Sequence, residues 1–160
     1  MREFSKISFE QFKKDVCDDK KLYEEYNLPK RQTKNSAGYD FESLTDFTLK
    51  PNESKKIPLG IKVKMNEDEF LMIVVRSSLG FKYNVRMCNQ VGIIDSDYFD
   101  NPDNEGHLFI KLYNEGNEEF CVKKHDRLCQ GIFTKFLTVS NEEEIKNKRT
   151  NGFGSTNRGE

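Results

Sequence analysis

The residues from Asn89 to Tyr98 carry the most informative chemistry of this chain. Their sequence, Asn-Gln-Val-Gly-Ile-Ile-Asp-Ser-Asp-Tyr, places the carboxylate of Asp95 and the ring of Tyr98 at the end of an apolar strand. A carboxylate held by rigid backbone is suited to activate water as a general base. Alone, the Asp-Ser-Asp sequence is more typical of an aspartate that forms hydrogen bonds within a turn.

Two other segments have the composition of phosphate-binding sites. Arg76-Ser77-Ser78-Leu79-Gly80 supplies a cation, two hydroxyls and a glycine, and Gly152-Phe153-Gly154-Ser155-Thr156 offers a similar set near the C-terminus. Taken singly, the first is more typical of a helix start with a serine cap, and the second of a disordered tail. Together with an acid and an aromatic ring, in this order, they favour hydrolysis of a nucleotide phosphate.

Length and composition narrow the class of protein. The chain has 160 residues, enough for one well-buried core and one domain. Hydrophobic residues make up 35% and charged residues 33%, which favours a surface-rich fold that hides apolar surface by oligomerising. Lys and Arg total 26 against 27 for Asp and Glu, a balance that argues against nucleic-acid binding. Without a long apolar run or a signal-peptide pattern, we expect no membrane association and a cytoplasmic location.

The residues that could ligate a transition metal are few and scattered. They are Cys17, Cys88, Cys121, Cys129, His107 and His125. There is no Cys-x-x-Cys pair, and the histidines have no helical metal-ligand spacing. We therefore expect the cysteines to behave as small hydrophobic residues and the protein to hold no caged transition metal.

An N-terminal helical segment is expected over residues 8–26. Its aromatic and aliphatic residues recur at near-helical spacing, and Ser8-Phe9-Glu10-Gln11 fits a capping box. The pair Asp18-Asp19 is expected to interrupt the helix.

From Thr45 onward the pattern changes to a period of two residues. Apolar residues recur at every second position over 61–65 and 108–112, and the continuous apolar run 70–75 indicates a buried strand. Frequent turn signals between these runs predict an all-β jelly roll. We expect one domain over residues 1–145, followed by a polar, basic and mobile arm over 146–160.

The chain resembles the trimeric dUTPases, because all five motifs of that family occur in order. They are Ala37-Gly38-Tyr39-Asp40, Arg76-Ser77-Ser78-Leu79-Gly80, Asn89 to Tyr98, Asp126-Arg127-Leu128-Cys129-Gln130 and Gly152-Phe153-Gly154-Ser155-Thr156. The third and fifth motifs are specific, whereas the second and fourth are weak alone. The resemblance implies a distorted jelly roll of the dUTPase β-clip type. It also implies hydrolysis of dUTP to dUMP and pyrophosphate, which keeps uracil out of DNA and supplies dUMP for thymidylate synthesis.

The resemblance also implies roles for individual residues. Asp95 would activate the water that attacks the α-phosphorus, and the ring of Tyr98 would leave no room for a 2′-hydroxyl. The implied substrate-binding residues are Arg76, Ser77, Ser78, Asn89, Gly92, Ile94, Tyr98, Phe109, Gln130, Arg149, Phe153, Gly154, Ser155 and Thr156. Among them, Asn89 and backbone near Phe109 would read uracil, and Phe153 would stack on it. The serine and threonine of the fifth motif would bind the γ-phosphate.

The implied cofactor is Mg²⁺, and the implied assembly is a homotrimer. The ion would be held mainly by the phosphates of dUTP, with Asp40 contacting it through water. Each active site would be shared by three subunits: one provides the second and fourth motifs, another the third, and the last donates its C-terminal arm as a lid.

Four features depart from the family pattern. The usual arginine stands five positions before the phenylalanine of the fifth motif, where this chain has Lys148, and we favour the neighbouring Arg149 as the phosphate ligand. His125 replaces a glycine, so its turn is expected to differ. The segment 99–107 exceeds the usual tight turn, and the helical segment 8–26 lies farther ahead of the first motif than is common. We assign neither of these last two a function from sequence.

Two other interpretations were weighed. A deoxycytidine triphosphate deaminase shares this fold and an Arg-Ser-Ser motif, but its proton-shuttling glutamate would fall at Lys111, which cannot replace a carboxylate. The second is a nucleotide-switched regulator that binds a protein partner. Asp95, Tyr98 and the arm favour an enzyme, and a regulatory partner stays open as an additional role.

Overall fold

The computed structural model describes residues 1–145 and residue 149. In chain order the elements are β1 (Glu3–Lys6), α1 (Phe9–Asp15), α2 (Lys20–Glu25), β2 (Tyr39–Glu42), β3 (Phe47–Leu49), β4 (Ser54–Pro58), β5 (Ile61–Lys64), β6 (Glu69–Val75), α3 (Ser77–Tyr83), β7 (Val85–Met87), β8 (Gly92–Asp95), the 3₁₀ turn η1 (Ser96–Tyr98), β9 (Phe109–Asn114), β10 (Phe120–Val122) and β11 (Arg127–Lys135). Strands dominate, as the sequence predicts.

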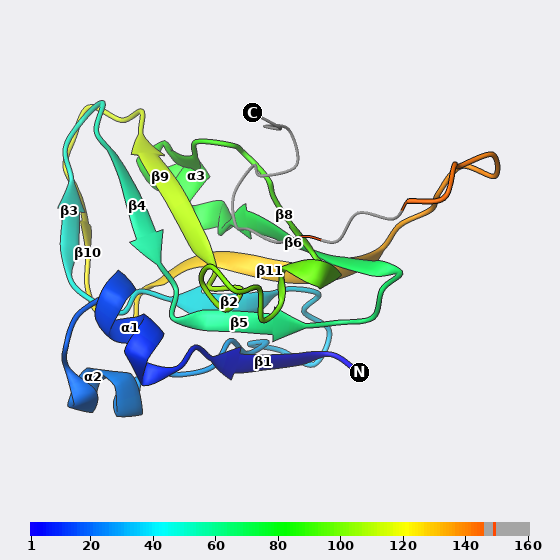
Figure 1. The fold of residues 1–160 in the computed structure, drawn as a ribbon. Helices are drawn as coiled ribbons and strands as arrows, with labels where there is room; N and C mark the ends of the chain where they lie inside the picture. The colour runs from blue at the N-terminus through cyan, green and yellow to red at the C-terminus, as the bar shows by residue number, and fades with distance from the viewer. Residues whose placement is uncertain (146–148, 150–160) are drawn as a thin grey trace, which may run out of the picture.

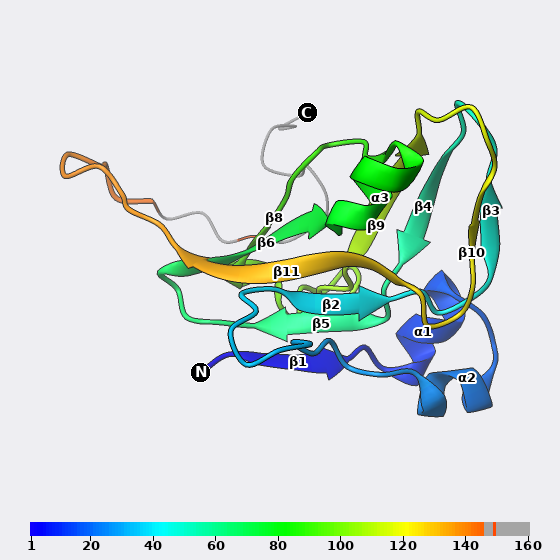
Figure 2. The same ribbon diagram turned by 180° about the vertical axis from the view of Figure 1, so that it is seen from behind.

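The strands of the described residues form small antiparallel sheets that surround one core. The largest has the order β2-β11-β6-β8, a second has the order β4-β9-β7, and β1 pairs with β5 and β3 with β10. β11 runs through the middle of the molecule, with the β4-β9-β7 sheet on one side and the β1-β5 pair on the other (Figures 1 and 2). The predicted all-β fold is confirmed.

The core follows the period-two pattern of the sequence. The residues that were expected to face inward are all buried: Ile61, Val63, Met65, Leu108, Ile110 and Leu112. Alternate positions of a strand point to opposite faces, so these side chains meet beneath the sheets while Lys64 and Lys111 face solvent. Fully burying an aliphatic side chain stabilises a fold by about 1.5–3 kcal/mol.

The strand β6 is covered on only one face, and here the expectation of a fully buried strand is wrong. Leu71 and Ile73 are buried, whereas Phe70, Met72 and Val74 are half-buried. The run is apolar on both faces, yet one chain supplies a core for one face only.

The helical segment divides into two short helices at the predicted place. Ser8 caps α1 by accepting a hydrogen bond from the amide of Gln11 at 3.1 Å, and Asp19 caps α2 by accepting from the amide of Leu22 at 3.0 Å. The capping box is incomplete, because the amide of Ser8 donates to Glu105 and not to Gln11. A cluster of stacked and edge-on aromatic rings joins the two helices: Phe9, Phe12, Tyr23 and Tyr26.

The turn before β11 keeps the backbone conformation that glycine favours. His125 has φ +71°, in the left-handed region, and its Nδ1 lies 2.9 Å from Oε2 of Glu42. Its amide also donates to the carbonyl of Ser43 at 2.9 Å. These contacts hold a non-glycine residue in a sparsely populated conformation, and whether the turn differs from that of a glycine-bearing relative stays a prediction.

After β11 the chain runs away from the body of the molecule (Figures 1 and 2). Large apolar side chains on this segment are exposed, among them Leu137 at 97% and Val139 at 64%. None of the helices in the described part of the chain is long and apolar enough to cross a membrane.

Candidate functional site

A polar pocket lies where β2, β11 and the start of α3 meet. It is lined by Gln32, Ser36, Gly38, Asp40, Arg76, Ser77, Ser78, Arg127 and Gln130. The fold therefore brings together the first, second and fourth motifs. Neither serine is the N-cap of α3, since that position is held by Arg76, which makes no side-chain cap bond. Their hydroxyls are left for other partners.

The centre of this polar pocket is the carboxylate of Asp40. It is 8% exposed, and its two oxygens face two guanidinium groups: Arg76 Nε lies 3.3 Å from Oδ1, and Arg127 Nη1 lies 3.2 Å from Oδ2. Such pairing restricts the rotamers of both arginines and aims their remaining N–H groups. Asp40 thus positions two cations beside the serines.

Gly38 makes room for the amide of Gln130 in the same pocket. A Cβ atom at Gly38 would lie 2.2 Å from Oε1 of Gln130, so a larger residue there would displace that side chain. The pairing of Gln130 with Asp40 across β11 and β2 fixes both in register.

A second pocket, with a mostly apolar lining, lies over β9 and the turn after β7. It is lined by Lys56, Cys88, Asn89, Phe109, Ile110 and Lys111. The turn is tight: Gln90 has φ +61° and its amide donates to the carbonyl of Met87 at 3.0 Å. Nζ of Lys56 lies 4.0 Å from the centroid of the Phe109 ring. An apolar cavity edged by an amide and by strand backbone suits a planar heterocycle.

Asp95 ends β8 with its side chain 53% exposed. It pairs with Phe70 of β6 across the strands, so the sheet fixes its backbone. The guanidinium of Arg149 contacts it, with Nη2 2.6 Å from Oδ2, and also lies 2.9 Å from Oδ1 of Asp97 through Nε. A carboxylate on a rigid strand end and open to solvent meets the geometric needs of a general base.

Tyr98 follows in the turn η1 and is 6% exposed. Burial raises the pKa of its hydroxyl, so the group stays protonated and able to donate. Gly92 and Ile94, which the family resemblance places among the substrate contacts, are buried. A Cβ at Gly92 would meet Ile73 at 3.3 Å, so these positions have backbone groups rather than side chains to offer.

The two pockets, Asp95 and Tyr98 do not form a single site within the described part of one chain. Within the described residues, the polar and the apolar pocket have no lining residue in common, and Asp95 and Tyr98 line neither. The carboxylate of Asp95, the apolar pocket and the polar pocket are therefore separate within the described part of one chain.

Comparison with known proteins identifies the family of this chain. The family model described as dUTPase matches residues 24–157. The deoxyuridine 5′-triphosphate nucleotidohydrolase of Lactococcus lactis is 45% identical over 131 residues, which are 81% of this chain and 87% of that protein. The chain belongs to the dUTPase family. The corresponding enzyme of Nautilia profundicola is 35% identical and is covered over 95% of its length, with 86% of this chain.

Solved dUTPases share the fold. The crystal structure of the Streptococcus mutans dUTPase superposes with a TM-score of 0.69 at 32% identity, covering 85% of this chain and 97% of that one. The equine infectious anaemia virus dUTPase, at 17% identity and a TM-score of 0.65, shows the fold alone. The chain is a dUTP diphosphatase with dUTP as its substrate.

Several dUTPase motif residues lie outside the described part of the chain: Lys148, Phe153, Gly154, Ser155 and Thr156. Arg149 is described, and it contacts Asp95 and Asp97 of its own chain. The lining residues that were missed from sequence include Arg127, Lys56 and Cys88. The first could have been found, because it stands inside the fourth dUTPase motif. The other two carry no sequence signal, since only the folding of β4 and β7 against β9 brings them to the pocket.

Proposed function

We propose that Asp95 activates a water molecule that attacks the α-phosphorus of dUTP and releases dUMP and pyrophosphate. The observation that carries this proposal is the exposed carboxylate of Asp95 on a fixed strand end, three residues before the buried ring of Tyr98. General-base catalysis of this kind contributes about 10²–10⁴-fold in rate.

The pocket over β9 is proposed to bind uracil. Its apolar lining offers two faces to a planar ring, and the amide of Asn89 can both donate to and accept from the uracil edge. The ring of Tyr98 is proposed to lie against the deoxyribose and to reject a 2′-hydroxyl by steric exclusion.

The polar pocket is proposed to hold the α- and β-phosphates. Arg76, the two serines and Gln130 provide donors there, and the pairing with Asp40 supports their orientation. Arg127 is proposed to add a second cation to this set, because it shares the same carboxylate.

Mg²⁺ is proposed as the cofactor, held mainly by the phosphates. The described residues contain no group of three or more His, Cys, Asp or Glu side chains able to cage a metal, and both oxygens of Asp40 face guanidinium groups. That donor set fits an ion that keeps its water shell and meets Asp40 through water. When bound, Mg²⁺ would neutralise charge on the leaving pyrophosphate. A phage phi11 dUTPase structure is described as showing coordination of a structural Mg(II) ion.

A homotrimer with shared sites is proposed to unite the separated parts. The uncovered face of the large sheet supports it, because Ile132, Met72 and Ile93 are direct cross-strand neighbours there, and Ile93 is 55% exposed. The exposed apolar side chains after β11 likewise lack cover within one chain. We propose that residues 1–145 form one domain and that residues 146–160 close the site of a neighbouring subunit.

The test is pyrophosphate release measured across dUTP, dTTP, dCTP and UTP with Mg²⁺. We expect dUTP to be hydrolysed far faster than the others, and we propose that dTTP is excluded by a clash of its 5-methyl group with the pocket. Chelation of Mg²⁺ should slow dUTP turnover and raise its KM. Comparable turnover of UTP and dUTP would overturn the Tyr98 assignment, and release of ammonia from dCTP would instead indicate a deaminase.

A further inference from the structure

The loop of residues 99–107, between η1 and β9, turns its polar groups inward onto Tyr98. The Tyr98 hydroxyl donates to the carbonyl of His107 at 3.0 Å and accepts from Nδ2 of Asn104 at 2.8 Å. Both directions of the hydroxyl are thus engaged by the loop. A ring with its far end tied in this way loses the freedom to tilt or slide.

Two asparagines hold the loop in the shape that makes these contacts. Asn101, 5% exposed, donates through Nδ2 to the carbonyl of Tyr98 at 2.8 Å and to Oδ1 of Asn104 at 2.9 Å. Oδ1 of Asn104 also accepts from the amide of Gly106 at 3.1 Å. Gly106 has φ +78°, and a Cβ there would lie 2.6 Å from the carbonyl oxygen of Tyr98. The loop backbone therefore packs directly against that of Tyr98.

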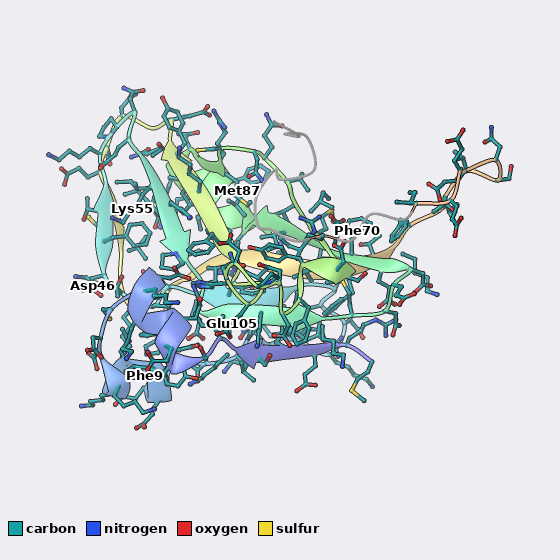
Figure 3. All side chains as sticks on the ribbon, in the orientation of Figure 1. Phe9, Asp46, Lys55, Phe70, Met87 and Glu105 are labelled. Carbon is teal, nitrogen blue, oxygen red and sulfur yellow. The ribbon has the colours of Figure 1, made fainter. Side chains whose placement is uncertain are left out.

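The outer side of the loop is anchored to the N-terminal segment. The carboxylate of Glu105, labelled in Figure 3, accepts from both the amide and the hydroxyl of Ser8, the cap of α1. Lys62 of β5 forms ion pairs with Glu105 and Asp100.

His107, at the end of the loop, makes a second anchor. Its ring is fully buried between Asp15 of α1, 2.6 Å from Nδ1, and the amide of Gly60, which donates to Nε2 at 2.9 Å. Both ring nitrogens are satisfied by a neutral imidazole with its proton on Nδ1. The loop is thereby fastened to α1 and to the start of β5.

We propose that the 99–107 loop is a sugar-selectivity brace, in which Asn104 is a positioning residue that holds the Tyr98 ring in place against the deoxyribose. This inference rests on the proposed contact between Tyr98 and the sugar. Steric rejection of a 2′-hydroxyl works only if the rejecting group cannot retreat, because a displacement of about 1 Å would admit the extra oxygen. The proposal gives one role to two departures from the family pattern, the helical segment 8–26 and the segment 99–107. Helix α1 and the loop are hydrogen-bonded to each other behind the Tyr98 ring.

The test compares kcat/KM for dUTP and for UTP in the full-length enzyme. Asn104→Ala removes one partner of the Tyr98 hydroxyl, and we expect the dUTP-to-UTP preference to fall about tenfold, mostly through faster use of UTP. Partial unfolding lowers both rates together and leaves their ratio unchanged. The matched control is Asp103→Asn at an exposed position of the same loop. In this variant the backbone N–H of residue 103 can still donate its hydrogen bond to Oδ1 of Asn101. It should keep the wild-type ratio.

Tyr98→Phe provides a second route to the same measurement, because it removes the hydroxyl that contacts the loop and keeps every residue of the loop in place. It should lower the preference by a similar factor, and Asn104→Ala added to it should have little further effect, as expected of two residues that act through one contact. Full additivity of the two changes would overturn the inference.

Tyr98→Ala separates this inference from the proposed function. A collapse of the preference in Tyr98→Ala, with a wild-type ratio in both Asn104→Ala and Tyr98→Phe, would overturn the brace and leave the sugar contact standing. An unchanged ratio in Tyr98→Ala would overturn the sugar contact and the brace together.

Discussion

Nη2 of Arg149 lies 2.6 Å from Oδ2 of Asp95, while its Nε lies 2.9 Å from Oδ1 of Asp97. The Arg149 side chain is 17% exposed, and its guanidinium contacts both carboxylates. One oxygen of the proposed general base thus contacts the cation that the sequence favours as a phosphate ligand. A triphosphate offers that cation a partner of higher charge, so substrate binding would free the Asp95 oxygen for water.

Arg149→Ala should raise the KM for dUTP and lower kcat/KM by about 10–100-fold, because a charge-assisted contact to phosphate is lost. Steady-state pyrophosphate release measures both constants. Lys148→Ala is the matched control and should change kcat/KM by less than about threefold, since a lysine is a less directional phosphate ligand. The reverse order of effects would assign the phosphate to Lys148.

Asp95→Asn should leave nucleotide binding nearly intact and lower turnover by about 10²–10⁴-fold, because an amide keeps the shape of the carboxylate but cannot accept a proton. Calorimetric binding of a non-hydrolysable dUTP analogue and steady-state turnover measure the two quantities separately. Asp97→Asn is the control, since it removes the other carboxylate beside Arg149 and not the base. Turnover above about a tenth of wild type in Asp95→Asn would exclude Asp95 as the base.

Local patterns predicted much of this molecule. The break between α1 and α2 at Asp18-Asp19 and the inward faces of β5 and β9 follow from capping chemistry and residue period, which act over a few neighbours. The grouping of Arg76 with Gln130 in one pocket was predicted from the family motifs, because residues of such motifs are expected to come together in the family fold.

Contacts between distant segments could not be predicted in the same way. The sharing of Asp40 by Arg76 and Arg127 depends on how β2 aligns with β11. Glu105 accepts the hydrogen bond from the amide of Ser8 that the capping box would give to Gln11, and Glu105 and Ser8 are 97 positions apart. No local pattern encodes such a pair, since its energy appears only once both segments are placed.

The buried His107 should make stability fall with acid. Burial lowers the pKa of His107 against the opposing effect of Asp15, and Lys56 lowers it further while Glu105 raises it. Its folded pKa therefore lies below the ordinary value of about 6.5, and the unfolded chain takes up the proton first. Below about pH 6.5 the free energy of unfolding should decrease as pH falls, and above it this group should contribute no slope. Protonation of Nε2 would break its bond with the amide of Gly60.

Urea unfolding at fixed protein concentration, followed between about pH 5 and 7.5, measures this slope. His107→Gln should be less stable near neutral pH and show a shallower dependence, by up to about one proton per chain. His125→Gln is the control, because that ring is partly exposed and lies outside the loop. Equal slopes in wild type and His107→Gln would contradict the assignment.

Deletion of residues 146–160 should leave the proposed trimer assembled and lower turnover by more than about 100-fold. The segment contains one large apolar residue, Phe153, too little to offset the backbone entropy of ordering it without nucleotide. Stacking and phosphate contacts would supply what the segment lacks. Light scattering and dUTP turnover check the two outcomes. Phe153→Ala should give a smaller loss in the same direction, and a truncated enzyme with near-normal turnover would show that the arm has no catalytic role.

Ile93→Glu should convert the proposed trimer into folded monomers that do not hydrolyse dUTP. The side chain stands beside Met72 on the uncovered face of the large sheet, and a carboxylate buried there against a neighbouring subunit would cost several kcal/mol per site. Because the apolar and polar pockets share no lining residue among the residues described in one chain, loss of assembly should remove activity without loss of the fold. Sedimentation gives the assembly state, and circular dichroism gives the fold. Thr48→Glu, which places the same charge on an exposed position of β3, should stay trimeric and active. A fully active Ile93→Glu monomer would mean that one chain completes its own site.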